Sequence, residues 1–158
     1  MVVMSWVKFV QTDIPSGKRL KSARIFDDVL RADVLINVPI AKHHGSARLT
    51  LGCKNLMGVI GNPNQFHRNL HQRIADLNTV VRPALTVVDA VRILTARGPG
   101  GGNLADVKKL DTVIASPDVI TADAYATTLF GLTADDIGYI RLGAEMGHDP
   151  APTGEQTA

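Results

Sequence analysis

Apolar residues recur along the chain with two periods, and the alternation of these periods predicts the order of helices and strands. The clearest helical period runs from Phe66 to Val81, where apolar residues fall three or four positions apart and form one stripe. Pro83 prevents this helix from continuing. Similar spacing and end signals predict four further helices, over residues 23–31, 49–60, 117–130 and 133–146.

Short apolar runs predict the strands. Residues 33–39 are apolar almost without interruption and are bounded by turn residues, a pattern typical of a strand buried on both faces in a parallel sheet. Residues 84–88 predict a second buried strand that ends in Asp89. Two more strands are predicted over residues 6–11 and 112–115.

The alternation of strands and helices predicts an α/β fold, a mostly parallel sheet covered by helices. We expect a single domain over residues 1–148, followed by a flexible tail over residues 149–158, which carry no periodicity. The length of 158 residues suits one domain.

Composition narrows the classes of function. The net charge is only +2 and no run of basic residues forms a dense patch, so we expect no binding to nucleic acid. No uncharged apolar stretch is long enough to cross a membrane, and we expect no membrane association. Cys53 is the single cysteine, so this chain alone cannot hold an iron–sulfur cluster with four thiolates. A reducing, cytoplasmic location is the simplest interpretation.

The densest polar signal is Lys42-His43-His44, directly after the predicted strand over residues 33–39. Ligands of open α/β sheets bind outside the carboxyl ends of the strands. A lysine and two histidines there could bind an anion, ligate a metal or transfer protons; the alternative is a solvated basic loop. Asp89, at the end of another predicted strand, would face the same crevice.

Lys54 and Asn55 interrupt an otherwise apolar predicted helix. A lysine held among apolar groups either pairs with an anion or loses its proton more readily, and both outcomes are chemically useful. The alternative is that the Lys54 ammonium group reaches solvent along its apolar stem. Cys53 beside it is interpreted as a small buried residue, not a nucleophile.

His67 and His71 lie four residues apart on the clearest predicted helix, the spacing at which two imidazoles can share a metal ion. With His44 they are the candidate ligands of a divalent metal. The alternative is two surface histidines beside Arg68 and Arg73, since the glutamate of the zinc protease signature is absent after His67. Asp123 falls mid-helix and could equally be a structural hydrogen-bonding residue.

Several ordered motifs carry a resemblance to a known family. They are the run Ala32–Pro39 followed by Lys42 and His44, then Leu51 with Lys54–Gly58, Ile74–Leu77, Pro83–Ala90, Gly98-Pro99 and Asp118–Ala124. Over roughly residues 20–148 the chain resembles domain of unknown function 362, a broad prokaryotic family without one settled activity.

The resemblance favours Lys42, His44, Lys54, Asn55 and Asp89 as catalytic residues, and it favours His44 over His43. It also implies a truncated member, because many relatives have a further α/β segment before the matching part. Some relatives carry a ferredoxin-like cysteine-rich module that this chain lacks, so their iron–sulfur cluster is not transferred.

Two hypotheses follow. The first is an uncharacterised member of this family with a metal- or anion-dependent active site of histidines and lysines, binding a small anionic ligand. The second is a non-catalytic binding or redox-partner domain that docks an acidic cofactor or an iron–sulfur protein. We leave open whether the chain is an enzyme and expect that an exposed sheet edge could form a homo-oligomer.

Overall fold

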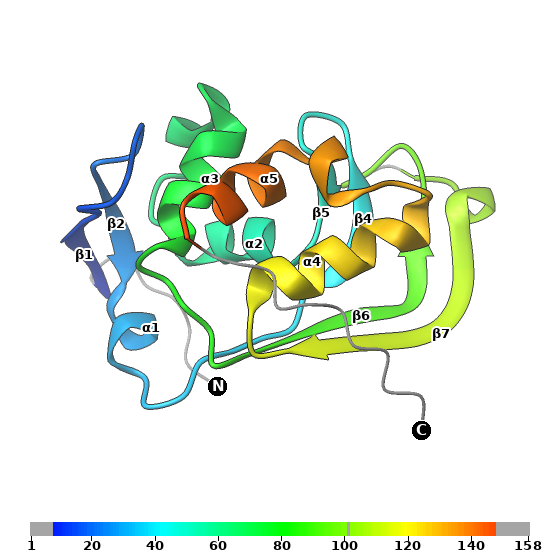
Figure 1. The fold of residues 1–158 in the computed structure, drawn as a ribbon, viewed down its shortest axis with the longest axis horizontal. Coiled ribbons are helices and arrows are strands. Elements are labelled where there is room, and N and C mark those ends of the chain that lie inside the picture. Colours follow the sequence, from blue (N-terminus) through cyan, green and yellow to red (C-terminus); the bar gives the residue numbers. More distant parts are fainter. Residues whose placement is uncertain (1–7, 101, 148–158) are drawn as a thin grey trace.

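The computed structural model describes residues 8–100 and 102–147 (Figure 1). Within them the strands and helices follow in chain order as β1 (Phe9–Asp13), β2 (Ser22–Phe26), α1 (Asp27–Arg31), β3 (Ile36–Asn37), β4 (Ile40–His44), β5 (Arg48–Thr50), α2 (Gly52–Asn55), α3 (Leu70–Asn78), β6 (Leu85–Leu94), β7 (Val107–Ser116), α4 (Val119–Thr127) and α5 (Gly138–Glu145).

Strand β6 organises the larger sheet. It pairs in parallel with β3 and β4 and antiparallel with β7, and β5 adds to β4 in the antiparallel direction. The predicted α/β class is confirmed, with a sheet that mixes the two directions. Strands β1 and β2 form a separate antiparallel pair. The predicted boundary at residue 148 stays a prediction, and the tail over residues 149–158 lies outside the described residues.

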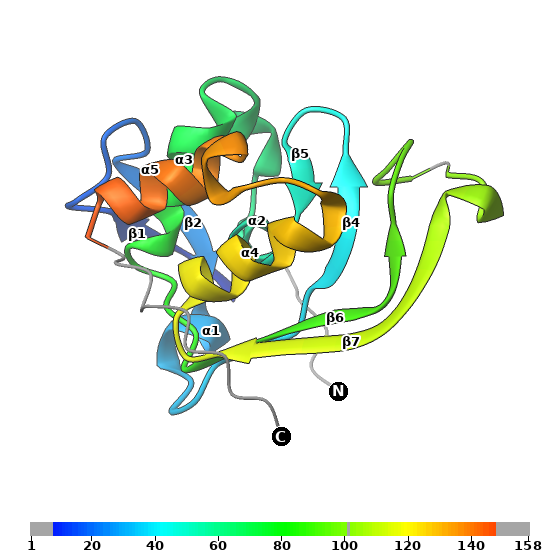
Figure 2. The same cartoon turned by 45° about the vertical axis from the view of Figure 1, so that its right-hand side comes forward.

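Helices α2, α3, α4 and α5 lie together on one side of this sheet, and β6 and β7 curve away as a long hairpin (Figures 1 and 2). The side chains of Thr86, Val88 and Ala90 point inward from β6 and are fully buried. Among the described residues, no helix combines the length and apolar character needed to cross a membrane.

The opposite face of the sheet is open to solvent, which corrects the prediction for residues 33–39. Continuous apolar sequence indicated a strand buried on both faces, but only two of these residues form a strand, β3. Apolar side chains on this face are more than half exposed: Val34 63%, Ile36 53%, Val38 60%, Ile40 53% and Val113 60%. An apolar run reveals β-forming residues but does not reveal whether a second layer covers them.

The buried carboxylate of Asp76 connects helix α3 to the loop between β1 and β2. Its oxygens accept the backbone N–H groups of Lys18 at 2.9 Å, Arg19 at 2.7 Å and Leu20 at 2.7 Å, and the side-chain amide of Gln72 at 2.9 Å. Four donors compensate this side chain for its complete loss of solvent. Asp76 therefore holds the small β1–β2 sheet against the helical layer.

Two predicted helices divide into other elements. Residues 23–31 were predicted helical, but Ser22–Phe26 forms β2, because alternate side chains (Ala23 and Ile25) are buried while the backbone pairs with β1. Only Asp27–Arg31 is helical. Residues 49–60 contain the end of β5, the short helix α2 and a 3₁₀ turn over Leu56–Val59.

The predicted helix over residues 66–81 is also interrupted. A 3₁₀ turn covers Pro63–His67, and Asn69 adopts a left-handed backbone conformation (φ 57°), so α3 begins only at Leu70. The apolar period is real, since Phe66, Ile74, Leu77 and Val81 are all buried. The backbone between Phe66 and Leu70 is nevertheless not α-helical.

Strands β4 and β5 were not predicted, and Lys42–His44, which were expected to follow a strand, lie within β4. Five other elements were predicted in kind but not in length. Strands β6 and β7 each extend over ten residues, longer than the predicted runs 84–88 and 112–115. Helices α4 and α5 lie within the predicted ranges 117–130 and 133–146, each with an adjoining 3₁₀ turn. Strand β1 covers the later part of the prediction over residues 6–11, whose first residues lie outside the described part of the chain.

We expect Asp76→Ala to lower the free energy of unfolding by about 3 kcal/mol, because it leaves buried N–H donors without an acceptor. Urea denaturation measures this change. The exposed Asp33 provides the matched control, and Asp33→Ala should stay within about 0.5 kcal/mol of wild type. Equal effects of the two substitutions would contradict the role of Asp76.

Candidate functional site

Helix α2, which carries Lys54 and Asn55, is held at its N-terminus by the buried carboxylate of Asp123. One oxygen accepts the Gly52 N–H at 2.6 Å and the other accepts the Cys53 N–H at 2.8 Å. The approach is close, because a Cβ at Gly52 would lie 2.8 Å from Oδ1 of Asp123 and 2.8 Å from a methyl group of Val119. A glycine is thus required where α2 meets α4.

Asn37 of β3 contacts both ends of α2. The buried Asn37 amide donates to the Gly52 carbonyl at 3.0 Å, and the Asn55 amide donates to Oδ1 of Asn37 at 2.8 Å. Asn55 is therefore part of the frame that orients α2. These hydrogen bonds at both ends of α2 hold the backbone of Lys54 in one position relative to the sheet.

Lys54 is half-buried, and burial lowers the pKa of Lys54, with a further contribution from the positive charge of Lys42. Across residues 8–100 and 102–147, the ammonium group of neither lysine forms a hydrogen bond or an ion pair with a described residue. A cation that loses solvent without gaining an acidic partner is costly. The two lysines therefore form a positive region that the described residues do not neutralise.

His44 belongs to the same region, and its protonation is constrained by the backbone. Its Nδ1 accepts the N–H groups of Ser46 at 3.2 Å and Ala47 at 3.3 Å in the turn after β4. A lone pair on Nδ1 places the hydrogen of the neutral ring on Nε2. Burial lowers the pKa of His44, and the charges of Lys54, His43, Lys42 and His67 lower it further. The neutral His44 ring thus presents Nε2–H as a donor.

The charges of Lys42, Lys54 and His67 all act on His44 and lower its pKa, and these four residues are hereafter called the cationic cluster. Lys42 and His44 are two residues apart in β4 and project from the same face of the strand. Asn55 adjoins the cluster through α2. These are five of the residues proposed from sequence.

His71 lies elsewhere. Its ring stacks beside Tyr139 with centroids 6.0 Å apart, and the pKa of His71 is lowered by burial and by Arg141. Because α3 begins after His67, the two histidines do not share one helix as their spacing predicted. The described residues contain no group of three or more His, Cys, Asp or Glu side chains placed to hold a metal ion. The divalent metal stays a prediction.

Asp89 does not end its strand, as the sequence predicted, because β6 continues to Leu94. It lies in register with Ile40 of β4 and Val113 of β7, on the open face of the sheet, and its Oδ1 accepts the Val91 N–H at 3.0 Å. This bond accompanies an irregularity in the pairing of β6 with both neighbours. The structure gives Asp89 a local structural contact.

Two buried residues complete the surroundings of α2. Cys53 is buried, and burial together with the carboxyl of Asp123 raises the pKa of the Cys53 thiol well above its ordinary value. The prediction that Cys53 is a small buried residue agrees with this position. The role of Asp123 as the acceptor for α2 could not be derived from sequence, because it depends on the contact between α2 and α4.

The profile of the family described as Domain of unknown function (DUF362) matches residues 2–128, most of the chain. The chain belongs to this family. The resemblance inferred from the motifs is therefore confirmed.

A curated relative is a thylakoid-associated protein of Synechocystis sp., 25% identical over 138 residues that cover 80% of this chain and 41% of that protein. The chain thus spans less than half the length of this relative. No solved structure gives a significant match.

The stability of the fold should carry the titration of Asp123. Burial raises the pKa of Asp123 to about 7 from an ordinary 3.8, so the folded state keeps a proton that the unfolded state loses near pH 4. This contribution to stability is complete below pH 4 and is lost as the pH rises towards 7. Asp123→Asn does not titrate, so its stability deficit relative to wild type should be about 2 kcal/mol larger at pH 5 than at pH 8. Urea denaturation at both pH values measures this, and a deficit independent of pH would contradict it.

Proposed function

We propose that the cationic cluster binds a small oxyanion, the phosphate or carboxylate group of a small-molecule ligand. The observation that carries this proposal is the half-buried Lys54, placed beside Lys42 with no acidic partner among the described residues. A bound anion would supply the missing counter-charge to both ammonium groups. Sites that sacrifice stability in this way are typical of binding and catalysis.

The protonation of His44 supports an anion. Its Nε2–H can donate to an oxyanion while the ring stays neutral, because Nδ1 is occupied by two backbone N–H groups. A metal ion would need the lone pair of Nε2, which this tautomer does not offer. His44 is therefore assigned as a hydrogen-bond donor, and Lys42 and Lys54 as the charges that attract the ligand.

The frame of α2 supports the same assignment. Asp123 and Asn37 fix both ends of a helix only four residues long, and Lys54 lies between the two fixed ends. Because the backbone that carries Lys54 is held in place, only the side chain has to be ordered when a ligand binds. We also propose that the ligand is met in the cytoplasm, which the single buried cysteine supports.

We expect inorganic phosphate, or succinate as a carboxylate probe, to raise the Tm by about 3–5 °C near saturation, compared with sodium chloride at equal ionic strength. Lys54→Met should abolish this rise. Lys21→Met, at an exposed lysine outside the cluster, should retain it. The two probes distinguish a phosphate ligand from a carboxylate ligand. If neither probe raises the Tm of the wild type more than chloride does, the proposal is wrong.

A second experiment separates binding from structure. Lys54→Met replaces an unneutralised, half-buried cation with an apolar side chain of similar length, so the free energy of unfolding without ligand should be equal to wild type or up to about 1 kcal/mol higher. Denaturation in a buffer without phosphate or carboxylate measures this. A loss of 2 kcal/mol or more would indicate that Lys54 is a structural residue.

A further inference from the structure

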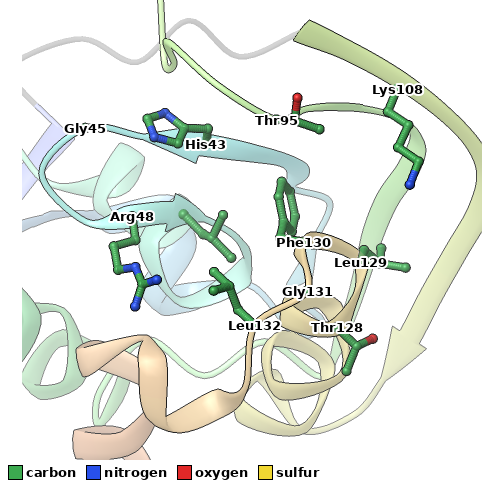
Figure 3. Close-up of a pocket in the computed structure, with 11 residues that line it drawn as sticks. His43, Gly45, Arg48, Thr95, Lys108, Thr128, Leu129, Phe130, Gly131 and Leu132 are labelled. Carbon is green, nitrogen blue, oxygen red and sulfur yellow. The ribbon is translucent and has the colours of Figure 1, made fainter.

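A separate cavity of about 710 Å³ opens between the β4–β5 hairpin, the β6–β7 hairpin and the turn that follows α4 (Figure 3). His43 of β4 lines it. Adjacent residues of a strand project from opposite faces, so His43 points away from the face that carries Lys42 and His44. The cavity is therefore distinct from the cationic cluster, although both use the same strand.

The cavity wall has two kinds of surface. Its charged groups are the cations Arg48 and Lys108 and the titratable His43, and no carboxylate is among the described residues that line it. Apolar side chains, Phe130 and Leu132 among them, provide the rest of the lining together with a few small and hydroxyl residues. In Figure 3, Phe130 lies between His43 and Lys108. A ligand that fits this wall carries a negative group attached to an apolar body.

Lys108 is the cation that is free to meet such a ligand. It pairs in the β-ladder with the buried Ile93, whereas its neighbour Lys109 pairs with the exposed Arg92, so the two lysines project from opposite faces of the hairpin. Lys109 forms an ion pair with Asp111 at 2.9 Å. Lys108 forms no ion pair with the residues that the structure describes.

The other two polar groups are held in place. The Arg48 guanidinium donates to the carbonyl of Asp136 at 2.9 Å and to its carboxylate at 3.2 Å, which fixes its position and shares its charge. Nδ1 of His43 accepts the Gly98 N–H at 3.1 Å, and the Gly45 N–H donates to the Gly98 carbonyl at 3.2 Å. His43 is thereby locked to the loop after β6, with Nε2–H as the donor of its neutral ring.

We propose that this cavity is a second binding site, which takes an amphipathic anion: a carboxylate attached to an aliphatic or aromatic body. The apolar body contacts Phe130 and Leu132. The carboxylate lies near Lys108, whereas Arg48 and His43 line the other side of the cavity, across Phe130 (Figure 3). The positive charge of Lys108 and the apolar wall act together, so neither a short anion nor an uncharged chain satisfies the whole site.

Octanoate, measured by titration calorimetry on the full chain, is the test probe, with acetate and 1-octanol as its short and uncharged counterparts. We expect octanoate to bind more tightly than either. Lys108→Met should weaken octanoate binding about threefold to fivefold, as expected for loss of one exposed charge, and Lys109→Met should leave it unchanged. Phe130→Ala, or Phe130→Leu if the first variant does not fold, should also weaken it.

The proposal is overturned if octanoate does not bind at millimolar concentration, or if Lys108→Met and the Phe130 variant leave octanoate binding unchanged. Binding that is lost in Lys54→Met but kept in Lys108→Met would assign octanoate to the cationic cluster and also overturn it. Phosphate stabilisation should be the same in Lys108→Met as in wild type, so failure at one site is distinguished from failure at the other.

Discussion

The site depends on the two hydrogen bonds that the first N–H groups of α2 donate to the Asp123 carboxylate. A helix of four residues has too few internal hydrogen bonds to persist by itself, so its position must come from outside. Asp123 of α4 fixes the N-terminus of α2, and Asn37 of β3 forms hydrogen bonds with its first and last residues. The orientation of Lys54 is thus determined by residues far from it in the sequence. The carboxyl that orders α2 is buried, and this burial raises the pKa of Asp123.

The placement of acidic residues explains why the cationic cluster keeps its charge. Asp76 and Asp123 are fully buried, and their carboxyl oxygens accept hydrogen bonds from backbone N–H groups. Asp106 and Asp136 pair with arginines at 2.6 Å and 3.2 Å. These acidic side chains bind backbone N–H groups or arginines, so they do not neutralise Lys42 and Lys54. The acidic residues therefore stabilise the fold at their own contacts, and the cationic cluster stays positively charged. A positive region of this kind attracts an anionic ligand.

How much of this could be predicted from sequence depends on how local each signal is. The segments of α4, α5, β6 and β7 have clear local patterns. The apolar residues around Lys54 and Asn55 identified these two as candidate site residues. The His67–His71 spacing misled because the left-handed Asn69 breaks the helix between them. Strand β2 required its partner β1, and the exposed face of residues 34–40 required knowledge of what covers the sheet. The roles of Asp76 and Asp123 depend on contacts across 56 or more positions in sequence, which no local pattern reveals.

The two proposed sites are linked by adjacent residues of one strand. His43 and His44 project from opposite faces of β4, yet each has its Nδ1 fixed by backbone N–H groups, so the neutral rings both present Nε2–H. The charge of His43 is among those that lower the pKa of His44. The strand thus places two donors of the same kind back to back.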